Sequence, residues 1–302
     1  MIGSKRTIAF GLCVLAALST RVIAYEPAAT GVPAVKPLRW QTDYAKAMKS
    51  AGARRQMMFV YFRPDAPTAN QQAFESISLA NRDVVEALSR MSLVQLPLNA
   101  TITSEGKPVR LLDHGAFAEL GGGAGLAIID MAHPEQPYYG HVVTTLPLVS
   151  GKYYQFRPEH LAVALKLPPG TLTQRTMVFA VRIHPESPAS TVGEFHPALA
   201  EEAESHSDYQ AQIRVQGHHQ WGSRFQRIRG RLPFNLLARE VVAESWPNER
   251  IMDAAVDCVD CWRQSSGHWS AVRARHPLFG YDMRRGSNGV WYATGIFGTN
   301  NM

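Results

Sequence analysis

The chain has 302 residues, a formal net charge of +6 and an ordinary apolar content of 45%, which indicates globular structure and excludes a disordered chain. This length predicts two domains of roughly 130 residues each. The mild positive charge excludes nucleic acid as an expected partner. One local cluster of arginines lacks the spacing of a helical face and predicts a solvated or salt-bridged stretch: Arg224, Arg227, Arg229 and Arg231.

Residues 1–24 have the layout of a cleaved secretory signal peptide. Lys5 and Arg6 precede the apolar run 8–18, and the segment 22–24 ends in alanine at a suitable cleavage point. The run is too short to span a bilayer comfortably, which disfavours an uncleaved anchor. Cleavage removes three basic residues, so the net charge falls from +6 to +3. We expect a secreted or periplasmic protein with no transmembrane segment in the mature chain.

Residues 25–37 are rich in proline and alanine and predict a linker. Beyond them, short apolar strands alternate with helical patterns, which predicts an α/β layer fold. The uninterrupted apolar run 57–62 is typical of a strand buried on both faces. Helices are expected at 40–52, 70–91, 113–120 and 159–165, and further strands at 93–98, 126–129 and 139–144.

The text "WQTDYAKAMKSAGARRQMMFVYF" resembles thioredoxin-like domains, in which a helix with a leading Trp precedes the buried central strand. The resemblance covers residues 38–166. A redox-active member would carry Cys-x-x-Cys just after that strand, where a helix N-terminus stabilises the thiolate. Here the segment is "RPDAPTANQQAF", which has no cysteine. The resemblance therefore implies a redox-inactive interaction module.

The segment "LKLPPGTLTQRT" has paired prolines, a glycine and no periodicity, so residues 167–176 predict a linker between domains. The second domain, 177–302, is expected to begin with a strand at 177–184. Helices follow at 196–213, where His206 lies on the buried face as a hydrogen-bonded core histidine, and at 251–264. The end of the chain predicts two antiparallel strands around the turn 286–289.

Gly267 is expected to stop the helix 251–264, which places His268 at a helix exit. Cys258 and Cys261 form a Cys-x-x-Cys inside this helix. Their spacing falls within the range that permits a disulfide, and two buried thiols are the equal alternative. A zinc site built from both cysteines and His268 is a third, more remote alternative. Ser265 and Ser266 are expected to cap the helix C-terminus.

The stretch "CWRQSSGHWSAV" resembles the W-x-x-S-x-G-H segment of the CAP superfamily, in its bacterial SCP-like form. "GHHQWGSRF" fits the family's first histidine, and "AREVVAESW" fits the segment that carries its glutamate. The resemblance covers about 195–298 and implies an α-β-α sandwich with His218, Glu240 and His268 in one cavity. Ser265 stands where many eukaryotic members have a second glutamate, so the cavity set is incomplete.

Two imidazoles and a carboxylate at His218, Glu240 and His268 could hold zinc with one open position, and bound water could then act as a nucleophile, with Glu244 or Glu240 as base. The alternative is a hydrogen-bonded cross-link between two elements. We expect a thioredoxin-like α/β domain followed by a CAP domain of α+β class. The predicted function is non-enzymatic extracytoplasmic binding of a protein, an envelope component or a small apolar ligand. The alternative is a metal-dependent hydrolase.

Overall fold

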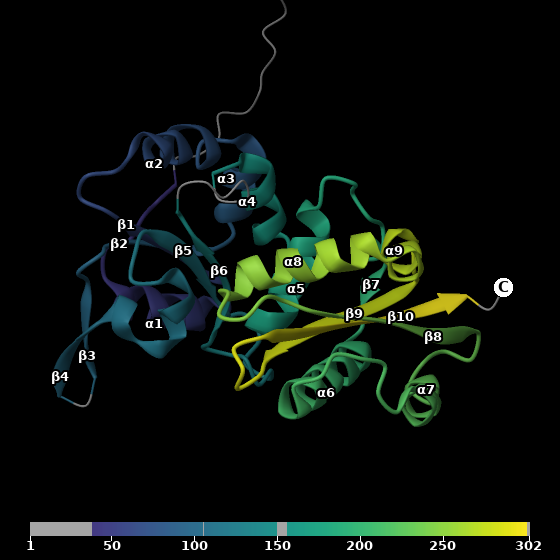
Figure 1. Ribbon diagram of the computed structural model, residues 1–302. Coiled ribbons are helices and arrows are strands. Elements are labelled where there is room, and N and C mark those ends of the chain that lie inside the picture. Colours follow the sequence, from purple (N-terminus) through teal and green to yellow (C-terminus); the bar gives the residue numbers. More distant parts are fainter. Residues whose placement is uncertain (1–37, 105, 150–155, 301–302) are drawn as a thin grey trace, which may run out of the picture. The chain divides into compact units, whose positions relative to one another are not determined.

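The fold is that of a computed structural model, which describes residues 38–104, 106–149 and 156–300. The predicted signal peptide 1–24 and linker 25–37 lie outside the described residues. Within the described part, helices combine with two four-stranded sheets and a two-stranded hairpin (Figure 1). The chain therefore has a mixed α/β fold, as the sequence predicts.

The first sheet has the strand order β2-β1-β5-β6. Its inner strand β1 (Met58–Arg63) pairs in parallel with β2 (Ser92–Pro97) and antiparallel with β5 (Gly125–Ile129). β5 in turn pairs antiparallel with β6 (Val142–Pro147). The first five residues of β1 are fully buried, because neighbouring strands cover both edges and helices cover both faces. The prediction of a strand buried on both sides is confirmed.

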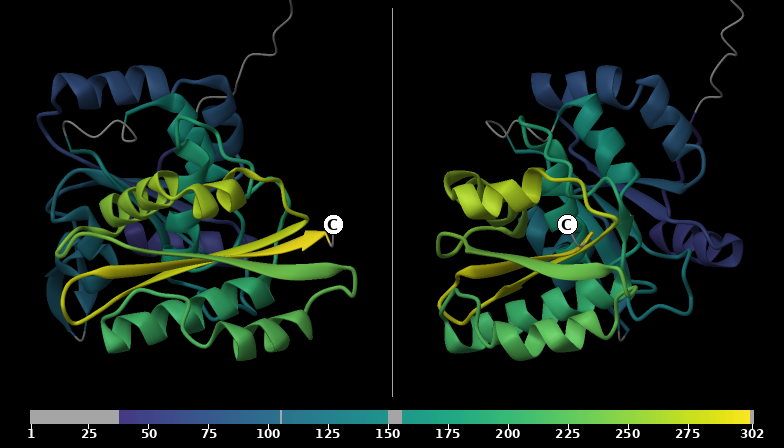
Figure 2. Two further views of the ribbon diagram at one scale, coloured as in Figure 1. Left: turned by 45° about the vertical axis from the view of Figure 1, so that its right-hand side comes forward. Right: turned by 90° about the vertical axis from the view of Figure 1, so that its right-hand side faces the viewer.

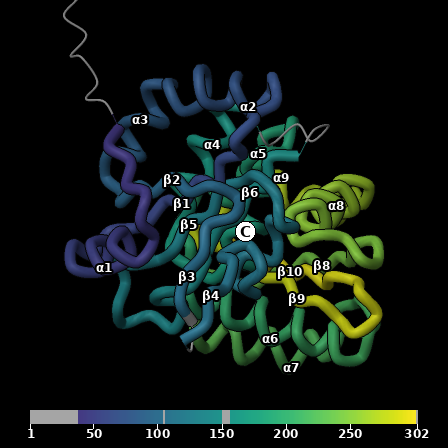
Figure 3. Tube along the Cα trace, turned by 90° about the vertical axis from the view of Figure 1, so that its left-hand side faces the viewer, coloured from purple at the N-terminus to yellow at the C-terminus, as the bar shows by residue number. Residues whose placement is uncertain are grey.

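Helices pack on the two faces of this sheet (Figure 3). α1 (Tyr44–Arg54) lies on one face and buries Ala47 and Ala51 in a cluster with alternate side chains of β1. α3 (Arg82–Leu88) and α4 (Pro158–Leu165) contribute to the cluster on the other face. Strict alternation of side chains along β1 therefore places its apolar residues in two separate clusters.

The predicted helix 70–91 consists of three pieces. α2 (Ala69–Ala73) runs into a π-helical turn, Phe74–Ser78, and α3 follows after a break. The break falls at Asn81, whose side chain accepts hydrogen bonds from two backbone N–H groups at the start of α3. Asn at this position favours a new helix start over continuation of the old helix.

Two smaller elements complete this half of the chain. The predicted helix 113–120 is a 3-10 helix, Gly115–Leu120. The hairpin of β3 (Thr101–Ser104) and β4 (Lys107–Arg110) was not predicted from the sequence. Its strands are short, and most of its described side chains are exposed or half-buried, so the apolar alternation that signals a strand is weak.

The prediction of a strand at 177–184 is wrong, because most of this stretch is the second half of helix α5 (Leu172–Ile183). The helix starts with a capping box in which the Thr171 and Gln174 side chains each accept the other residue's backbone N–H. Nearly all of α5 is buried. A helix buried on all sides has no polar stripe, so its apolar run looks like that of a buried strand. The predicted linker 167–176 contains the first turn of this helix.

The second sheet has the order β7-β9-β10-β8. β9 and β10 form the predicted antiparallel hairpin around residues 286–289, and β8 pairs antiparallel with β10. The short strand β7 adds to the other edge in parallel with β9. The bounds are β7 (Glu194–Phe195), β8 (Leu236–Glu244), β9 (Leu278–Arg285) and β10 (Trp291–Asn300).

Helices form a layer on each side of this sheet (Figure 2). α6 (Pro197–Ile213) and α7 (Trp221–Arg229) lie on one side, and α8 (Ile251–Gln264) and α9 (Ser266–Arg273) lie on the other. The predicted helices 196–213 and 251–264 are confirmed almost to the residue. In both helices small apolar residues recur at helical spacing, so each presents one continuous face to the sheet.

Gly267 does not stop α8, contrary to the prediction. α8 ends at Gln264, and Ser265 adopts an extended conformation between α8 and α9. Gly267 and His268 are in the first turn of α9. Ser265 is the C-cap residue of α8, where its backbone N–H donates to the carbonyl oxygen of Trp262, and it is also the N-cap residue of α9, without a side-chain cap bond. The predicted cap is therefore confirmed for Ser265, whereas Ser266 is the first residue of α9 and does not cap α8.

α5 contacts elements of both halves of the chain, namely α4 and β6 in the first and α8 and β9 in the second. A single cluster of buried apolar residues accordingly includes Phe59, Leu161, Met177, Trp262 and Phe297. All described residues belong to one compact unit. The boundary between the domains 38–166 and 177–302 stays a prediction. No helix within the described ranges is long and apolar enough to cross a membrane.

Candidate functional site

The three residues predicted to share a cavity come from three different elements and lie together. His218 is in the loop between α6 and α7, Glu240 is on β8, and His268 is in the first turn of α9. His218 Nδ1 lies 2.9 Å from Glu240 Oε1, and the Nε2 atoms of His218 and His268 are 3.2 Å apart. The residues form a hydrogen-bonded chain from a buried carboxylate to the surface.

Arg224 of α7 holds the inner end of this chain. Its guanidinium forms a two-pronged ion pair with the Glu240 carboxylate, through Nη1 to Oε1 and Nη2 to Oε2. Both side chains are nearly inaccessible to solvent, at 7% and 1% exposure. An arginine fork of this kind keeps a buried glutamate ionised. Sequence analysis assigned Arg224 to a solvated or salt-bridged stretch, so it missed this role.

The charge on Glu240 determines which nitrogen of His218 carries its proton. A carboxylate accepts hydrogen bonds only, so His218 Nδ1–H is the donor in its bond to Oε1. In the neutral ring the Nε2 lone pair then points at His268, which donates its own Nε2–H. Burial, followed by the nearby Arg224 charge, lowers the pKa of His218, and burial lowers the pKa of His268. Both rings are therefore neutral at neutral pH and carry lone pairs.

His206 of α6 supports the loop that carries His218. It is 2% exposed, and its Nε2 lies 2.9 Å from the carbonyl oxygen of Gly217. The ring donates this bond, because a carbonyl only accepts. Burial lowers the pKa of His206 to about 4. The prediction of a hydrogen-bonded core histidine is confirmed, and the bond places the backbone immediately before His218.

The turn that carries His268 is held by its neighbours. Trp269 Nε1 donates to the Glu186 carboxylate at 3.0 Å, and the same carboxylate pairs with Arg263 of α8. Arg239 of β8 donates to the carbonyl oxygen of Gly267 and to Ser270 Oγ. The turn that carries His268 is thus tied to both the preceding helix and the sheet.

The arrangement fits two metal-binding nitrogens but not the predicted set of three ligands. Both oxygens of Glu240 are occupied by Arg224 and His218, so binding a cation there would leave a buried guanidinium unpaired. No group of three or more histidine, cysteine or acidic side chains in the described part of the chain is arranged to hold a metal ion. Glu240 instead occupies the position of an outer partner that orients a histidine.

The proposed general bases are also unsuited to hydrolysis. The Glu240 side chain is 1% exposed and its charge is paired with Arg224, so it is not accessible to a water molecule that needs a base. Glu244 is four residues further along the same strand, a separation of about 13 Å at 3.3 Å per residue. Its exposed side chain is therefore too far from the histidine pair to take a proton from water held there.

Cys258 and Cys261 are both free thiols in the structure, one buried and one exposed. Cys258 faces the core, whereas the Cys261 Sγ lies 3.8 Å from the carbonyl oxygen of Glu244. Burial raises the pKa of both thiols, and nearby acidic groups raise it further. A disulfide between them stays a prediction, and in the reduced form neither thiol is activated.

Comparison with known proteins gives little further evidence. No family model matches the chain, and no curated protein matches it. Among solved structures, an outer surface protein from Borrelia burgdorferi is similar over 36% of this chain and 78% of its own, with 19% identity and a TM-score of 0.30. A likeness at this level carries no argument about the family or the function of this chain, which therefore rest on the site.

Proposed function

We propose that this chain is an exported, non-enzymatic binding protein, in which a thioredoxin-like module without redox cysteines precedes an SCP-like CAP domain. The signal-like segment 1–24 supports export. The observation that carries the proposal is the chain His268–His218–Glu240–Arg224, which ends in two exposed or half-exposed neutral imidazoles. The charge of Glu240 at the inner end is compensated by Arg224, so the group offered to solvent is the pair of imidazoles and not a free carboxylate.

The two imidazoles fit a divalent metal ion such as zinc. Their Nε2 atoms are 3.2 Å apart, about the separation of two ligands of one tetrahedral zinc with Zn–N distances of about 2.0–2.1 Å. Zinc would replace the hydrogen bond between the two rings, with the proton of neutral His268 on Nδ1 in place of Nε2. Glu240 orients His218 for this role from behind. A zinc ion supplies open positions to which an oxygen or nitrogen of a binding partner can attach. With two protein ligands we expect weaker binding than at sites with three or four.

The test is titration of zinc chloride into the purified mature protein by calorimetry. We expect one zinc per chain, and at least tenfold weaker binding in His218→Ala and in His268→Ala. His141→Ala is the matched control, because His141 is exposed immediately before β6, in the other four-stranded sheet. Absence of zinc binding, or binding unaffected by either change, would leave the pair as a structural cross-link and overturn the metal proposal.

A separate experiment tests the proposal that the protein does not catalyse hydrolysis. The zinc-loaded protein is incubated with ester, peptide and phosphate-ester substrates, and we expect no turnover above that of free zinc. Zinc-dependent hydrolysis that disappears in both His218→Ala and His268→Ala, while folding is retained, would establish the hydrolase instead.

A further inference from the structure

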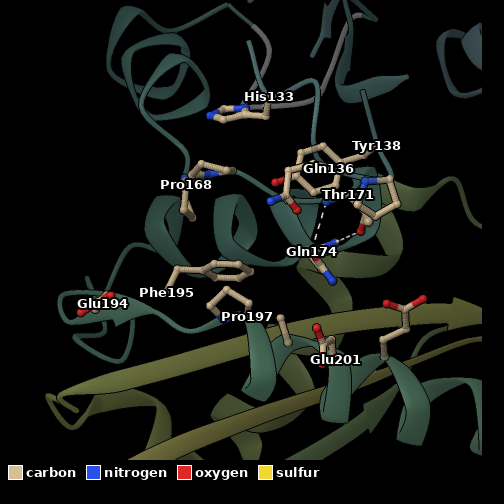
Figure 4. A pocket seen from close by; sticks show the side chains of 15 residues that line it. His133, Gln136, Tyr138, Pro168, Thr171, Gln174, Glu194, Phe195, Pro197 and Glu201 are labelled. Atoms are coloured by element: carbon tan, nitrogen blue, oxygen red, sulfur yellow. Dashed lines mark hydrogen bonds between the residues drawn. The ribbon is translucent and has the colours of Figure 1, made fainter. Parts of the chain in front are cut away.

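A second cavity, of about 510 Å³, lies away from the histidine pair. It is formed by the loop 133–138, the segment 168–174 at the start of α5, strand β7 and the first turns of α6 (Figure 4). Its volume is in the range of small-molecule sites, which is about 300–1,000 Å³. None of its lining residues belongs to the chain His268–His218–Glu240–Arg224, so it is a separate site.

Rings form much of the cavity wall. Tyr138, Pro168, Phe195 and Pro197 present rings toward the space (Figure 4). Phe195 packs edge-on against Phe279, with ring centroids 5.8 Å apart, and the pairing of β7 with β9 fixes its position. Aromatic faces and edges of this kind pack well against the ring of an aromatic ligand.

The backbone that carries these rings is held by internal hydrogen bonds. The capping box at the start of α5 fixes the segment 168–174. At the other side of the cavity, the buried Asp130 accepts the backbone N–H groups of Ala132 and His133 and so fixes the start of the loop 133–138. The pocket is therefore preformed, which lowers the cost of binding.

The lining of this cavity directs no unpaired charge into the space. It contains no lysine and no arginine. Two of its three glutamates pair with arginines outside the lining: Glu201 and Glu204. Glu194 borders the cavity, but it precedes Phe195 on β7, and strand alternation turns its side chain away from the space that Phe195 faces (Figure 4). Any charge on His133 is compensated by the buried Asp130, whose Oδ2 lies 2.8 Å from its Nδ1.

We propose that this cavity binds a neutral, apolar molecule built on an aromatic ring, a site that lies beyond the function proposed for the histidine pair. The rings of Tyr138, Phe195 and the prolines pack against the ligand and remove its apolar surface from water. An ammonium or carboxylate group inside the cavity would lose its hydration and gain no unpaired opposite charge. The uncharged ligand is therefore favoured over a cation or an anion of the same shape.

The experiment uses N-phenyl-1-naphthylamine, an uncharged aromatic probe whose fluorescence increases in apolar surroundings. We expect saturable binding of one probe per chain. The bound probe is then displaced by three compounds of nearly equal shape: 4-phenylbutanol, 4-phenylbutylamine and 4-phenylbutyrate. We expect the alcohol to displace it at concentrations at least tenfold lower than either charged compound. Absence of saturable binding, or a charged compound that displaces the probe as well as the alcohol does, would overturn the proposal.

Two variants locate the probe. Tyr138→Ser removes one ring from the wall, and Phe234→Ser is its control, because Phe234 is an exposed aromatic residue in the loop before β8. We expect probe binding to weaken severalfold in Tyr138→Ser and to remain unchanged in Phe234→Ser.

Pro197→Asp places a charge at the cavity wall, at the first position of α6, where an acidic residue is compatible with the helix. Pro247→Asp is its control, because Pro247 is exposed in the loop between β8 and α8. We expect at least tenfold weaker probe binding in Pro197→Asp alone. Circular dichroism verifies that each variant is folded, and unchanged probe binding in folded Tyr138→Ser or folded Pro197→Asp would contradict the proposed site.

Discussion

Two buried arginines in this molecule perform different tasks with the same side chain. Arg175 of α5 is 3% exposed and donates to carbonyl oxygens of β6 and of the end of α4, without an ion pair to any described carboxylate. Arg224 is 6% exposed and binds the Glu240 carboxylate beneath the histidine pair. Burial lowers the pKa of both guanidiniums to about 10, so both remain charged at neutral pH.

The two guanidinium groups differ in the partners that they bind. Arg175 joins backbone segments where the two halves of the chain meet, and carbonyl groups do not titrate. Arg224 stabilises a single carboxylate, which in turn orients His218 through Nδ1. The first region should therefore contribute to stability independently of pH, and the second should couple stability to the protonation of its surroundings.

The largest effect is expected for Arg175→Met. The substitution keeps the apolar stem but leaves the carbonyls of Val143, Leu167 and Pro168 without their buried donor, so the free energy of unfolding should fall by about 4 kcal/mol. Urea unfolding at pH 7 measures this. Arg82→Met, at an exposed arginine, should change it by less than about 0.5 kcal/mol. Equal effects of the two changes would show that Arg175 is not the link described here.

For Glu240→Met we expect the free energy of unfolding to fall by about 3 kcal/mol, because the substitution leaves Arg224 buried without a counter-charge. The double variant Arg224→Met/Glu240→Met should be more stable than this single variant, since two apolar side chains replace the pair. A double-mutant cycle by urea unfolding gives the coupling. If the double variant is no more stable than Glu240→Met, the buried charge of Arg224 does not depend on Glu240 for its stabilisation, and the contrast with Arg175 fails.

The smallest of the three expected effects is a change in the free energy of unfolding with pH. Burial, followed by the charge of Arg224, lowers the pKa of His206 from 6.5 to about 4, so between these values the unfolded chain binds a proton that the folded chain does not. The stability from this residue is present above pH 6.5 and is lost as the pH falls toward 4. It should amount to about 2 kcal/mol between pH 7 and pH 5.

His206→Gln should remove this part of the pH dependence, because the amide can still donate to the Gly217 carbonyl but does not titrate. Unfolding free energies of both proteins at pH 7 and pH 5 give the difference. The loss caused by Arg175→Met should be the same at both pH values. An unchanged pH dependence in His206→Gln would mean that the histidine is not protonated on unfolding as proposed.

Much of the fold could be predicted where one side of an element is polar. The helix 251–264 was predicted to the residue, because Asp253, Asp257 and Asp260 alternate with a buried stripe. The strand 57–62 was recognisable from its length and aromatic content. The stretch 177–184 was misassigned, since α5 is covered on nearly all sides and shows no periodicity.

Within the candidate site, the sequence identified residue types but not their partners. His218, Glu240 and His268 were selected through a family resemblance, and they lie in one hydrogen-bonded chain. Arg224 was assigned to a surface stretch, although its contact with Glu240 decides that the carboxylate is neither a free ligand nor a base. The pairing joins residues 16 positions apart, on a helix and a strand, and no local pattern reports such a contact.

By itself, the sequence determined the mixed α/β class, the absence of a redox Cys-x-x-Cys after the first strand, the position of the terminal hairpin and the amphipathic helices of the second half. These features depend on local periodicity and residue type, which the chain carries directly. Only the tertiary structure decided the proton position on His218 and the ion pair between Arg224 and Glu240. Each of these depends on which distant groups share a buried, low-dielectric space, where one charged neighbour outweighs local preference.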